Sequence, residues 1–325
     1  MRVLVAGGAG YIGSVTAAQL LQQKHSVVVY DNLDRGHRAA VPAGAEFVEA
    51  DLGDYRTLVV TLKKHHIDTV MHFAAHSLVG ESMEHPELYY ENNVVVGKRI
   101  LDAMRAAEVN YIVFSSTCAT FGEPATLPIT EDLPQLPTNP YGETKLAFER
   151  MLHWYHQVHG LNYTVLRYFN AAGAAHGLGE DHDPESHIIP IVLQVALGQR
   201  QQVSIFGEDY PTPDGTCVRD YIHIVDLAQA HILAMEKKRD TASHYNLGNG
   251  AGYSVKEVIE TARRVTGHPI PATIGPRRPG DPPELVGSAA KIKRELGWQP
   301  QYPDLESIVR SAWDWHQKYP HGYVE

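Results

Sequence analysis

The feature that most constrains the fold of this chain is a run of glycines directly after its first apolar segment. The sequence opens with RVLVAGGAGYIGS, where a short apolar stretch meets Gly7, Gly10 and Gly13 and then enters an apolar helical pattern. In such a strand–turn–helix, Gly7 and Gly10 would let the backbone approach phosphates, and Gly13 would allow close packing of helix on strand. The N–H groups that begin the helix then face negative charge. The motif therefore predicts a pyrophosphate-binding turn on an α/β sheet.

The first 170 residues alternate β-branched runs with helical patterns. The runs cover residues 2–5, 26–31, 46–50, 69–73, 111–115 and 162–167. Continuous apolar strands separated by helices are typical of a parallel sheet that is covered on both faces. We therefore predict an α/β, doubly wound parallel sheet of Rossmann type over residues 1–170, with parts of about 207–250 returning to it.

The composition and the lengths of the predicted elements change near residue 171. Gly, Pro, His and Asp crowd residues 173–190, and shorter elements follow at 203–206, 225–237, 245–247 and 254–266. A proline-rich loop, GPRRPGDPPE, precedes an amphipathic helix at the end of the chain. Residues 171–325 therefore predict a second, smaller α/β substrate domain that is interleaved with the first.

An acidic residue at the end of the second predicted strand indicates which dinucleotide binds. Asp31 closes VVVYD about 20 residues after the glycines, which is the usual place of a ribose-binding carboxylate. Such a carboxylate accepts hydrogen bonds from both ribose hydroxyls and repels a 2′-phosphate. Arg35 lies nearby, and its positive charge is a mild signal in favour of NADP. The pattern favours NAD over NADP.

A tyrosine and a lysine four residues apart predict proton transfer. Tyr141 and Lys145 lie in NPYGETK, at the start of a helical stretch, so they share a helix face. A nearby ammonium, together with a positive nicotinamide ring, favours the phenolate and lowers the pKa of the tyrosine. Ser115, Ser116 and Thr117 end the preceding strand, where a doubly wound sheet places its ligands. Thr117 can exchange hydrogen bonds with the reacting hydroxyl.

Composition narrows the partners and the compartment. The 325 residues carry a formal net charge of −10 and no long basic run, which argues against nucleic acid or an anionic membrane. No apolar stretch approaches the roughly 20 residues of a membrane helix, and the N-terminus does not resemble a signal peptide. Cys118 and Cys217 are the only cysteines and fit a reducing cytoplasm. We expect a cytoplasmic protein.

Nineteen histidines raise the question of a metal site. His153, His156 and His159 are spaced three apart, which drifts round a helix, and His65 and His66 point in different directions. No HExxH or CxxC motif accompanies them. We therefore expect solvated histidines and no metal.

Longer motifs make a family resemblance specific. They are GGAGYIGS, DNL, HFAA, VGES, FSST, NPYGETKL, LRYFNAAGA, IFGEDYPTPDGTCVRDYIHIVDLA, YNLGNG, RRPGD and a closing W-x-W helix. On these, nearly end to end, the chain resembles the extended short-chain dehydrogenase/reductases and, within them, the UDP-hexose 4-epimerases. The resemblance implies interconversion of UDP-galactose and UDP-glucose through a 4-keto sugar with tightly bound NAD, and N-acetylhexosamine forms as further substrates. It also implies a homodimer that pairs helices at 87–107 and 141–160.

The resemblance also implies roles for individual residues. Tyr141 would take the proton of the sugar 4-hydroxyl, with help from Thr117, and Lys145 would hold the nicotinamide ribose. Besides the glycines and Asp31, the cofactor would be lined by Tyr11, Ile12, Asn32, Asp51, Leu52, Phe73, Ala74, Asn92, Ser115, Tyr168 and Phe169. The nucleotide would be held by Asn170, Ile188, Phe206, Arg219, Tyr221, Arg278 and Asp281, and Leu285 would border the C2 substituent of the sugar. Ser77 departs from the lysine that the better-known bacterial members carry there.

Other functions stay open at this stage. In the related dehydratases an Asp-Glu pair follows the threonine, whereas Cys118 and Ala119 follow Thr117 here, which favours epimerisation. An epimerase for UDP-pentoses is not excluded by the motifs. A regulatory protein that only senses NAD would have no need of Tyr141, Lys145 and Thr117 together.

Overall fold

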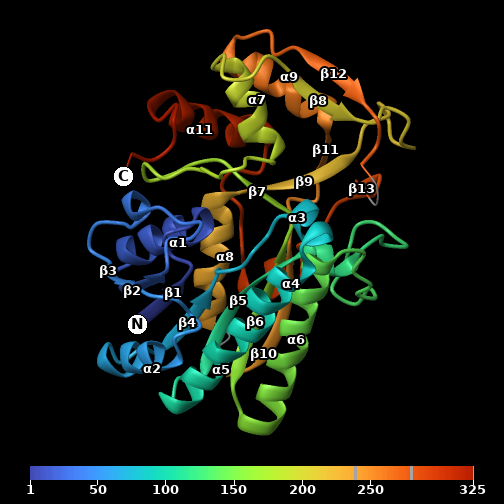
Figure 1. The fold of residues 1–325 in the computed structure, drawn as a ribbon. Helices are drawn as coiled ribbons and strands as arrows, with labels where there is room; N and C mark the ends of the chain where they lie inside the picture. The colour runs from blue at the N-terminus through green and yellow to red at the C-terminus, as the bar shows by residue number, and fades with distance from the viewer. Residues whose placement is uncertain (238–239, 279–280, 325) are drawn as a thin grey trace.

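A parallel seven-stranded sheet forms the larger part of the molecule, shown in Figure 1 as a computed structural model that describes residues 1–237, 240–278 and 281–324. Its strand order is β10-β6-β5-β4-β1-β2-β3. The strands are β1 (Arg2–Ala6), β2 (Ser26–Asp31), β3 (Glu46–Glu49), β4 (Thr69–His72), β5 (Tyr111–Thr117), β6 (Asn162–Tyr168) and β10 (Ala242–Leu247). All six pairings are parallel, so the predicted doubly wound sheet is confirmed.

Helices cover both faces of this sheet because its strands are apolar on both sides. Val3 and Val5 of β1 join one core, and Leu4 and Ala6 join the other. Helices α1 (Tyr11–Gln22), α8 (Ile224–Lys237) and α10 (Ala290–Leu296) pack on the first side; α2 (Tyr55–Lys64), α5 (Gly97–Ala106) and α6 (Pro140–His159) pack on the second. The remaining elements of this region are η1 (Arg38–Ala40), α3 (Val79–Glu84), α4 (Pro86–Tyr89), the π-helix η2 (Tyr90–Val96) and the 3-10 turn η3 (Cys118–Phe121).

The chain changes direction across the sheet between β1 and β4. From β1 it moves outward through β2 to β3, and then returns to β4 on the other side of β1 and continues through β5 to β6. Ligands bind at such a switch point, outside the carboxyl ends of the strands. The two strand ends are close, because a Cβ built on Gly7 would lie 2.5 Å from the backbone nitrogen of Ala74.

A second group of elements lies above the carboxyl ends of the large sheet (Figure 1). β9 (Val218–His223) pairs with β7 (Asn170–Ala172), β11 (Gly252–Ser254) and β13 (Glu284–Leu285), and β8 (Val203–Phe206) pairs with β12 (Ala272–Gly275). Helices α7 (Ile188–Ala196), α9 (Val255–Thr266) and α11 (Leu305–Lys318) share one core with them. Pro279 and Gly280 of the proline-rich loop lie outside the described residues. Within the described residues, no helix is long and apolar enough to cross a membrane.

The expected helix at 87–107 differs from the observed one. The segment runs as α4, then the π-helix η2, then α5, so its middle carries wider turns than an α-helix. Asn93 within η2 is buried and explains part of this, because its amide donates to the carbonyl of His76 at 3.0 Å and to Thr144 Oγ1 at 3.0 Å. These contacts to other segments are invisible in a local sequence pattern.

Candidate active site

The glycine loop joins β1 to α1 at the switch point. Gly7 has a φ of +79°, which disfavours a side chain, and a Cβ on Gly13 would lie 2.1 Å from the carbonyl oxygen of Gly7. The backbone of the loop itself therefore requires glycine at both positions, whether or not a ligand is bound. A Cβ on Gly10 would meet only the carbonyl oxygen of Gly7 at 3.5 Å. Gly10 is the N-cap of α1, and within the described chain no side chain caps this helix. The first-turn N–H groups of Tyr11 and Ile12 therefore fit a phosphate.

Asp31 ties the end of β2 to the glycine loop. The buried carboxylate accepts the N–H of Ala9 at 2.9 Å through Oδ2 and the N–H of Leu33 at 2.9 Å through Oδ1. A carboxylate has about four acceptor positions, so two bonds leave capacity for ribose hydroxyls. The guanidinium of Arg35 binds Glu81 at 3.1 Å, so its charge is already paired. This arrangement fits NAD.

The other residues expected around the cofactor lie at the carboxyl ends of the strands, some of them in contact. Asn32 Nδ2 donates to Asp51 Oδ2 at 2.8 Å, and the hydroxyls of Ser115 and Tyr168 are 2.9 Å apart. Leu52 and Phe169 are buried, and Phe73 and Ala74 follow β4 beside Gly7. Asn92 lies in η2, where its amide donates to Asn93 Oδ1 at 3.1 Å. Their roles toward NAD stay predictions.

Tyr141 lies in the first turn of α6 and is buried. The turn is fixed by its N-cap, because Asn139 Oδ1 accepts the N–H of Gly142 at 2.8 Å and Pro140 opens the helix. Burial raises the pKa of the Tyr141 phenol above its ordinary value, the neighbouring Tyr168 raises it further, and a hydrogen bond with Thr117 lowers it. The structure thus brings Tyr141 and Thr117 together, as expected.

Lys145 lies one turn further along α6. Its Nζ donates to the carbonyl of Ser115 at 2.8 Å and lies 4.9 Å from the centre of the Phe114 ring. Burial lowers the pKa of Lys145 to about 7, and Glu149 opposes that shift. Burial is the largest cause of the raised pKa of Tyr141, and the expected lowering by Lys145 together with a nicotinamide ring stays a prediction. The buried lysine is only partly charged near neutral pH, and burial dominates at the tyrosine.

Glu149, a further turn along α6, belongs to a buried ion pair that we did not predict. Arg167 of β6 donates to it through Nη2 at 2.6 Å, and Ser116 Oγ donates at 2.6 Å. The two charged side chains are 3% and 5% exposed. The spacing Tyr-x₃-Lys-x₃-Glu places Glu149 on the helix face of Lys145, and this was the available sequence signal.

The residues expected to hold the nucleotide gather along β9 and the loop after β12. Arg219 binds the carboxylate of Asp281 and the carbonyl of Pro282 at 2.8 Å, and the guanidinium of Arg278 lies 4.0 Å over the Phe206 ring. Each expected arginine thus contacts another expected residue. The remaining three are placed as follows: Asn170 donates to the carbonyl of Asp220 at 2.9 Å, Tyr221 is buried in β9, and Ile188 begins α7.

Leu285 lies close to the residue that follows Thr117. It pairs with Arg219 in the register of β13 and β9, and it packs on a small core of Phe121, Ile129 and Phe169. Cys118 packs on the same core. The expected role of Leu285 beside the sugar stays a prediction.

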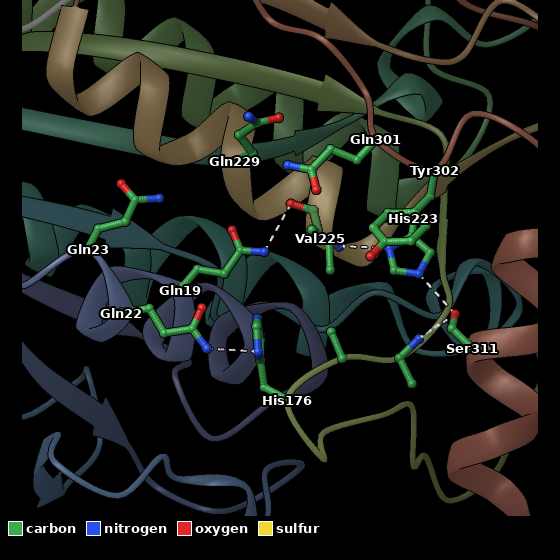
Figure 2. Close-up of a pocket in the computed structure, with 12 residues that line it drawn as sticks. Gln19, Gln22, Gln23, His176, His223, Val225, Gln229, Gln301, Tyr302 and Ser311 are labelled. Atoms are coloured by element: carbon green, nitrogen blue, oxygen red, sulfur yellow. Dashed lines mark hydrogen bonds between the residues drawn. The ribbon is translucent and has the colours of Figure 1, made fainter.

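A pocket elsewhere in the molecule is not this site. Figure 2 shows it between α1, α8 and residues near 175 and 301, with Gln19 donating to the carbonyl of Val225 at 3.2 Å and His223 within 2.9 Å of Ser311. Its lining shares no residue with the candidate site.

Comparison with known proteins agrees with this geometry. The model of the NAD dependent epimerase/dehydratase family matches residues 3–248. A UDP-glucose 4-epimerase of Halalkalibacterium halodurans is 57% identical over 99% of this chain and 98% of its own. A crystal structure of a UDP-glucose 4-epimerase has a TM-score of 0.97 at 51% identity and full coverage of both chains. That of a UDP-glucose 4-epimerase from Bifidobacterium longum, in complex with NAD⁺ and UDP, has a TM-score of 0.95 at 38% identity, covering 99% of this chain and all of that one.

Proposed function

The chain belongs to the NAD dependent epimerase/dehydratase family and acts as an NAD-dependent 4-epimerase on UDP-glucose and UDP-galactose; from this premise we propose that Tyr141, Thr117 and Lys145 carry the reaction. NAD, when bound, supplies the acceptor that takes up the C4 hydride of the sugar and returns it. No net oxidation results, so the cofactor has no need to leave between turnovers.

The placement of Tyr141 carries this proposal: it lies in the first turn of α6, one turn before Lys145, whose Nζ donates at 2.8 Å to the carbonyl of Ser115 in the strand that ends at Thr117. Tyr141 takes the proton of the sugar 4-hydroxyl, and Thr117 bridges the phenol and that hydroxyl at the end of β5. The raised pKa of the isolated phenol is lowered when positive charge is brought close to it. After the 4-keto sugar presents its other face, Tyr141 returns the proton, which gives the epimer.

Lys145 has a positioning part in this scheme. Its hydrogen bond to the carbonyl of Ser115 fixes Nζ near the end of β5. The hydroxyl of the same serine lies 2.9 Å from the hydroxyl of Tyr168. A protonated Lys145 donates hydrogen bonds to the hydroxyls of the nicotinamide ribose and so holds the nicotinamide ring near Tyr141. Glu149 favours the protonated form by raising the lysine pKa.

Elimination of water, the dehydratase alternative, lacks an acid or base where it needs one. Cys118 follows Thr117, and burial raises the pKa of its thiol to about 12, so it is neither a base nor an acid of useful strength. Turning the 4-keto sugar so that its other face meets the cofactor requires no further acid or base.

We also propose the UDP-sugar site, the domain division and the assembly. Arg219 and Arg278 hold the diphosphate, since guanidinium groups match phosphate oxygens in pairs. Residues 1–170 with parts of 207–250 form the NAD-binding domain, and residues 171–325 form the sugar-nucleotide domain. The enzyme is a cytoplasmic homodimer, and exposed apolar side chains on α6, Trp154 and Val158, support the paired helices.

Incubation of the purified protein with UDP-galactose, UDP-N-acetylgalactosamine and UDP-xylose tests the assignment. Chromatography of the products is expected to show UDP-glucose from the first substrate and slower conversion of the second. Conversion of UDP-xylose alone would replace the hexose assignment by a pentose one, and no conversion of any substrate would refute the proposed catalytic roles.

A further inference from the structure

Four possible metal ligands converge in the loop that precedes α7. The segment 180–187 reads EDHDPESH, and Glu180, His182, Glu185 and His187 each bring one ligand atom within 4.8 Å of the other three. The histidines that we considered from sequence, such as His153, lie elsewhere. The spacing Glu-x-His-x₂-Glu-x-His resembles neither HExxH nor CxxC, so these two zinc motifs do not indicate it in the sequence.

The four nitrogen–oxygen distances in this cluster lie between 3.0 and 3.7 Å. His187 Nδ1 lies 3.0 Å from Glu180 Oε1 and 3.0 Å from Glu185 Oε1, and His182 Nδ1 lies 3.3 Å from Glu180 Oε1 and 3.7 Å from Glu185 Oε2. Zinc bound to nitrogen and oxygen at about 2.0–2.1 Å in tetrahedral geometry separates its ligands by about 3.3 Å. The nitrogen–oxygen distances are close to that separation, and all four ligand atoms lie within 4.8 Å of one another.

The carboxylates are unusually well buried for acidic side chains in a loop. The side chains of Glu180 and Glu185 are only 6% and 4% exposed, and their ion pairs within the described residues are with His182 and His187. Nδ1 of His182 is itself buried and, within the described chain, has no hydrogen-bond partner of proper geometry. An orphaned ring nitrogen aimed at two buried carboxylates is the arrangement that a metal completes.

Outer contacts already hold the ligands in place. Glu185 Oε1 accepts the backbone N–H groups of Ser186 at 2.8 Å and of His187 at 2.7 Å, which fixes its carboxylate. Such supporting bonds orient the ligands of metal sites. The two imidazole rings lie 5.2 Å apart.

From this geometry we infer that Glu180, His182, Glu185 and His187 form a structural site for one zinc ion. One divalent cation carries the charge that balances the two buried carboxylates. Two nitrogens and two oxygens suit zinc, whereas calcium and magnesium prefer oxygen alone. Four protein ligands leave no position open for substrate, so the site stabilises the loop and takes no part in the chemistry.

The proposed zinc site would lie beside the first turn of α1, which belongs to the expected cofactor site. The ring of His182 lies 6.4 Å from that of Tyr11 in the first turn of α1, and the Tyr11 hydroxyl donates to the carbonyl of Gly173 at 2.6 Å. His316 of α11 also interacts electrostatically with the carboxylates of Glu180 and Glu185. A filled site would fix residues 173–187 between α1 and α11, so we expect zinc to raise the thermal stability of the NAD-loaded enzyme.

The test measures zinc directly on the NAD-loaded enzyme. After treatment with a chelator and desalting, the protein is dialysed against micromolar zinc, and its metal content is measured by mass spectrometry. We expect about one zinc per chain and a higher melting temperature. The variant His182→Ala/His187→Ala should bind zinc more weakly by over about 100-fold, since outer partners alone contribute 10–100-fold. The matched control His153→Ala/His159→Ala removes two histidines of α6 and should bind as the parent does.

Two further results decide the matter if the double variant does not fold. X-ray absorption of the zinc-loaded parent should show two imidazoles and two oxygens, and the milder Glu185→Gln variant should lose zinc while it keeps NAD. Failure of the parent to retain zinc, equal zinc in parent and His182→Ala/His187→Ala, or a different ligand set would overturn the inference and leave a pure ion-pair cluster. None of these readouts depends on epimerase activity.

Discussion

At the scale of single residues, the proposed chemistry depends on the phenol of Tyr141, which burial in the protein alone keeps protonated. Burial raises the pKa of Tyr141, and Thr117 is the group that opposes the shift through a hydrogen bond. The hydroxyl of Tyr141 is therefore useful as a base only beside bound substrate and cofactor. This limits proton transfer to the filled site.

Replacement of Tyr141 by Phe removes the hydroxyl and keeps the ring. We expect kcat for UDP-galactose to fall by about 10²–10⁴-fold, because general acid–base groups contribute that much, while bound NAD and UDP affinity are kept. Tyr55→Phe is the matched control, since that tyrosine is 43% exposed on α2. A Tyr141→Phe enzyme within a few-fold of the parent would identify another group as the base.

Leu285 tests the sugar range, because a side chain at this position is expected to border the C2 substituent. Leu285→Tyr adds volume and should lower kcat/KM for UDP-N-acetylgalactosamine selectively, whereas Leu285→Ser should raise it. The quantity to compare is the ratio of kcat/KM for the N-acetylated and the plain sugar. A ratio that does not change across the three proteins would show that Leu285 is not the gate.

At the scale of elements, α6 carries two of the proposed catalytic side chains, and Glu149 of a buried ion pair lies one turn further on. Tyr141, Lys145 and Glu149 follow one another at intervals of one turn, and Glu149 fastens the helix to β6 through Arg167. The ion pair lies beside Ser116, between the two strand-end residues Ser115 and Thr117. Damage to it should therefore affect both stability and catalysis.

Arg167→Met leaves the Glu149 carboxylate buried without its guanidinium. Breaking one partner of a buried pair costs about 3–5 kcal/mol in the free energy of unfolding, so a large loss in urea denaturation is expected. Arg310→Met is the control, because its pair with Glu306 is exposed and should change stability by less than about 1 kcal/mol. Equal losses in both variants would contradict the importance of the buried pair.

Much of this element level could be predicted from sequence, and the failures have a common cause. The strands at 26–31 and 203–206 and the Tyr141–Lys145 face follow from local periodicity, which the observed bounds of β2, β8 and α6 match. The short strands β7, β11 and β13 exist only because β9 lies between them, and η2 forms around contacts of Asn93. The Glu149–Arg167 pair likewise needs α6 docked on β6 before it can be seen.

At the scale of the whole molecule, the candidate site draws its residues from both the large sheet and the elements above it. Thr117 and Tyr141 come from the larger part, and Arg219 and Leu285 come from the smaller one. The interleaving could be predicted in outline, since β10 returns to the large sheet after β9. The contacts between the two parts required the structure, because they join residues far apart in sequence.

The proposed homodimer is tested through the exposed apolar residues of α6. Trp154 and Val158 are 64% and 66% exposed, and burying them in a partner would stabilise a pair of chains. Trp154→Glu/Val158→Glu should shift the mass in light scattering from dimer to monomer at micromolar concentration. Val60→Glu, at a residue 56% exposed on α2, is the control and should stay dimeric. A monomeric parent would refute the dimer.

The fate of the C4 hydrogen tests the central claim most directly. UDP-galactose deuterated at C4 is incubated with the purified protein in ordinary water without added NAD, and the UDP-glucose formed is analysed by mass spectrometry and NMR. Because the hydride is returned within one site and only the hydroxyl proton passes through Tyr141, the account predicts that the product keeps its deuterium at C4. Loss of deuterium to the solvent, or a requirement for added NAD in every turnover, would contradict it.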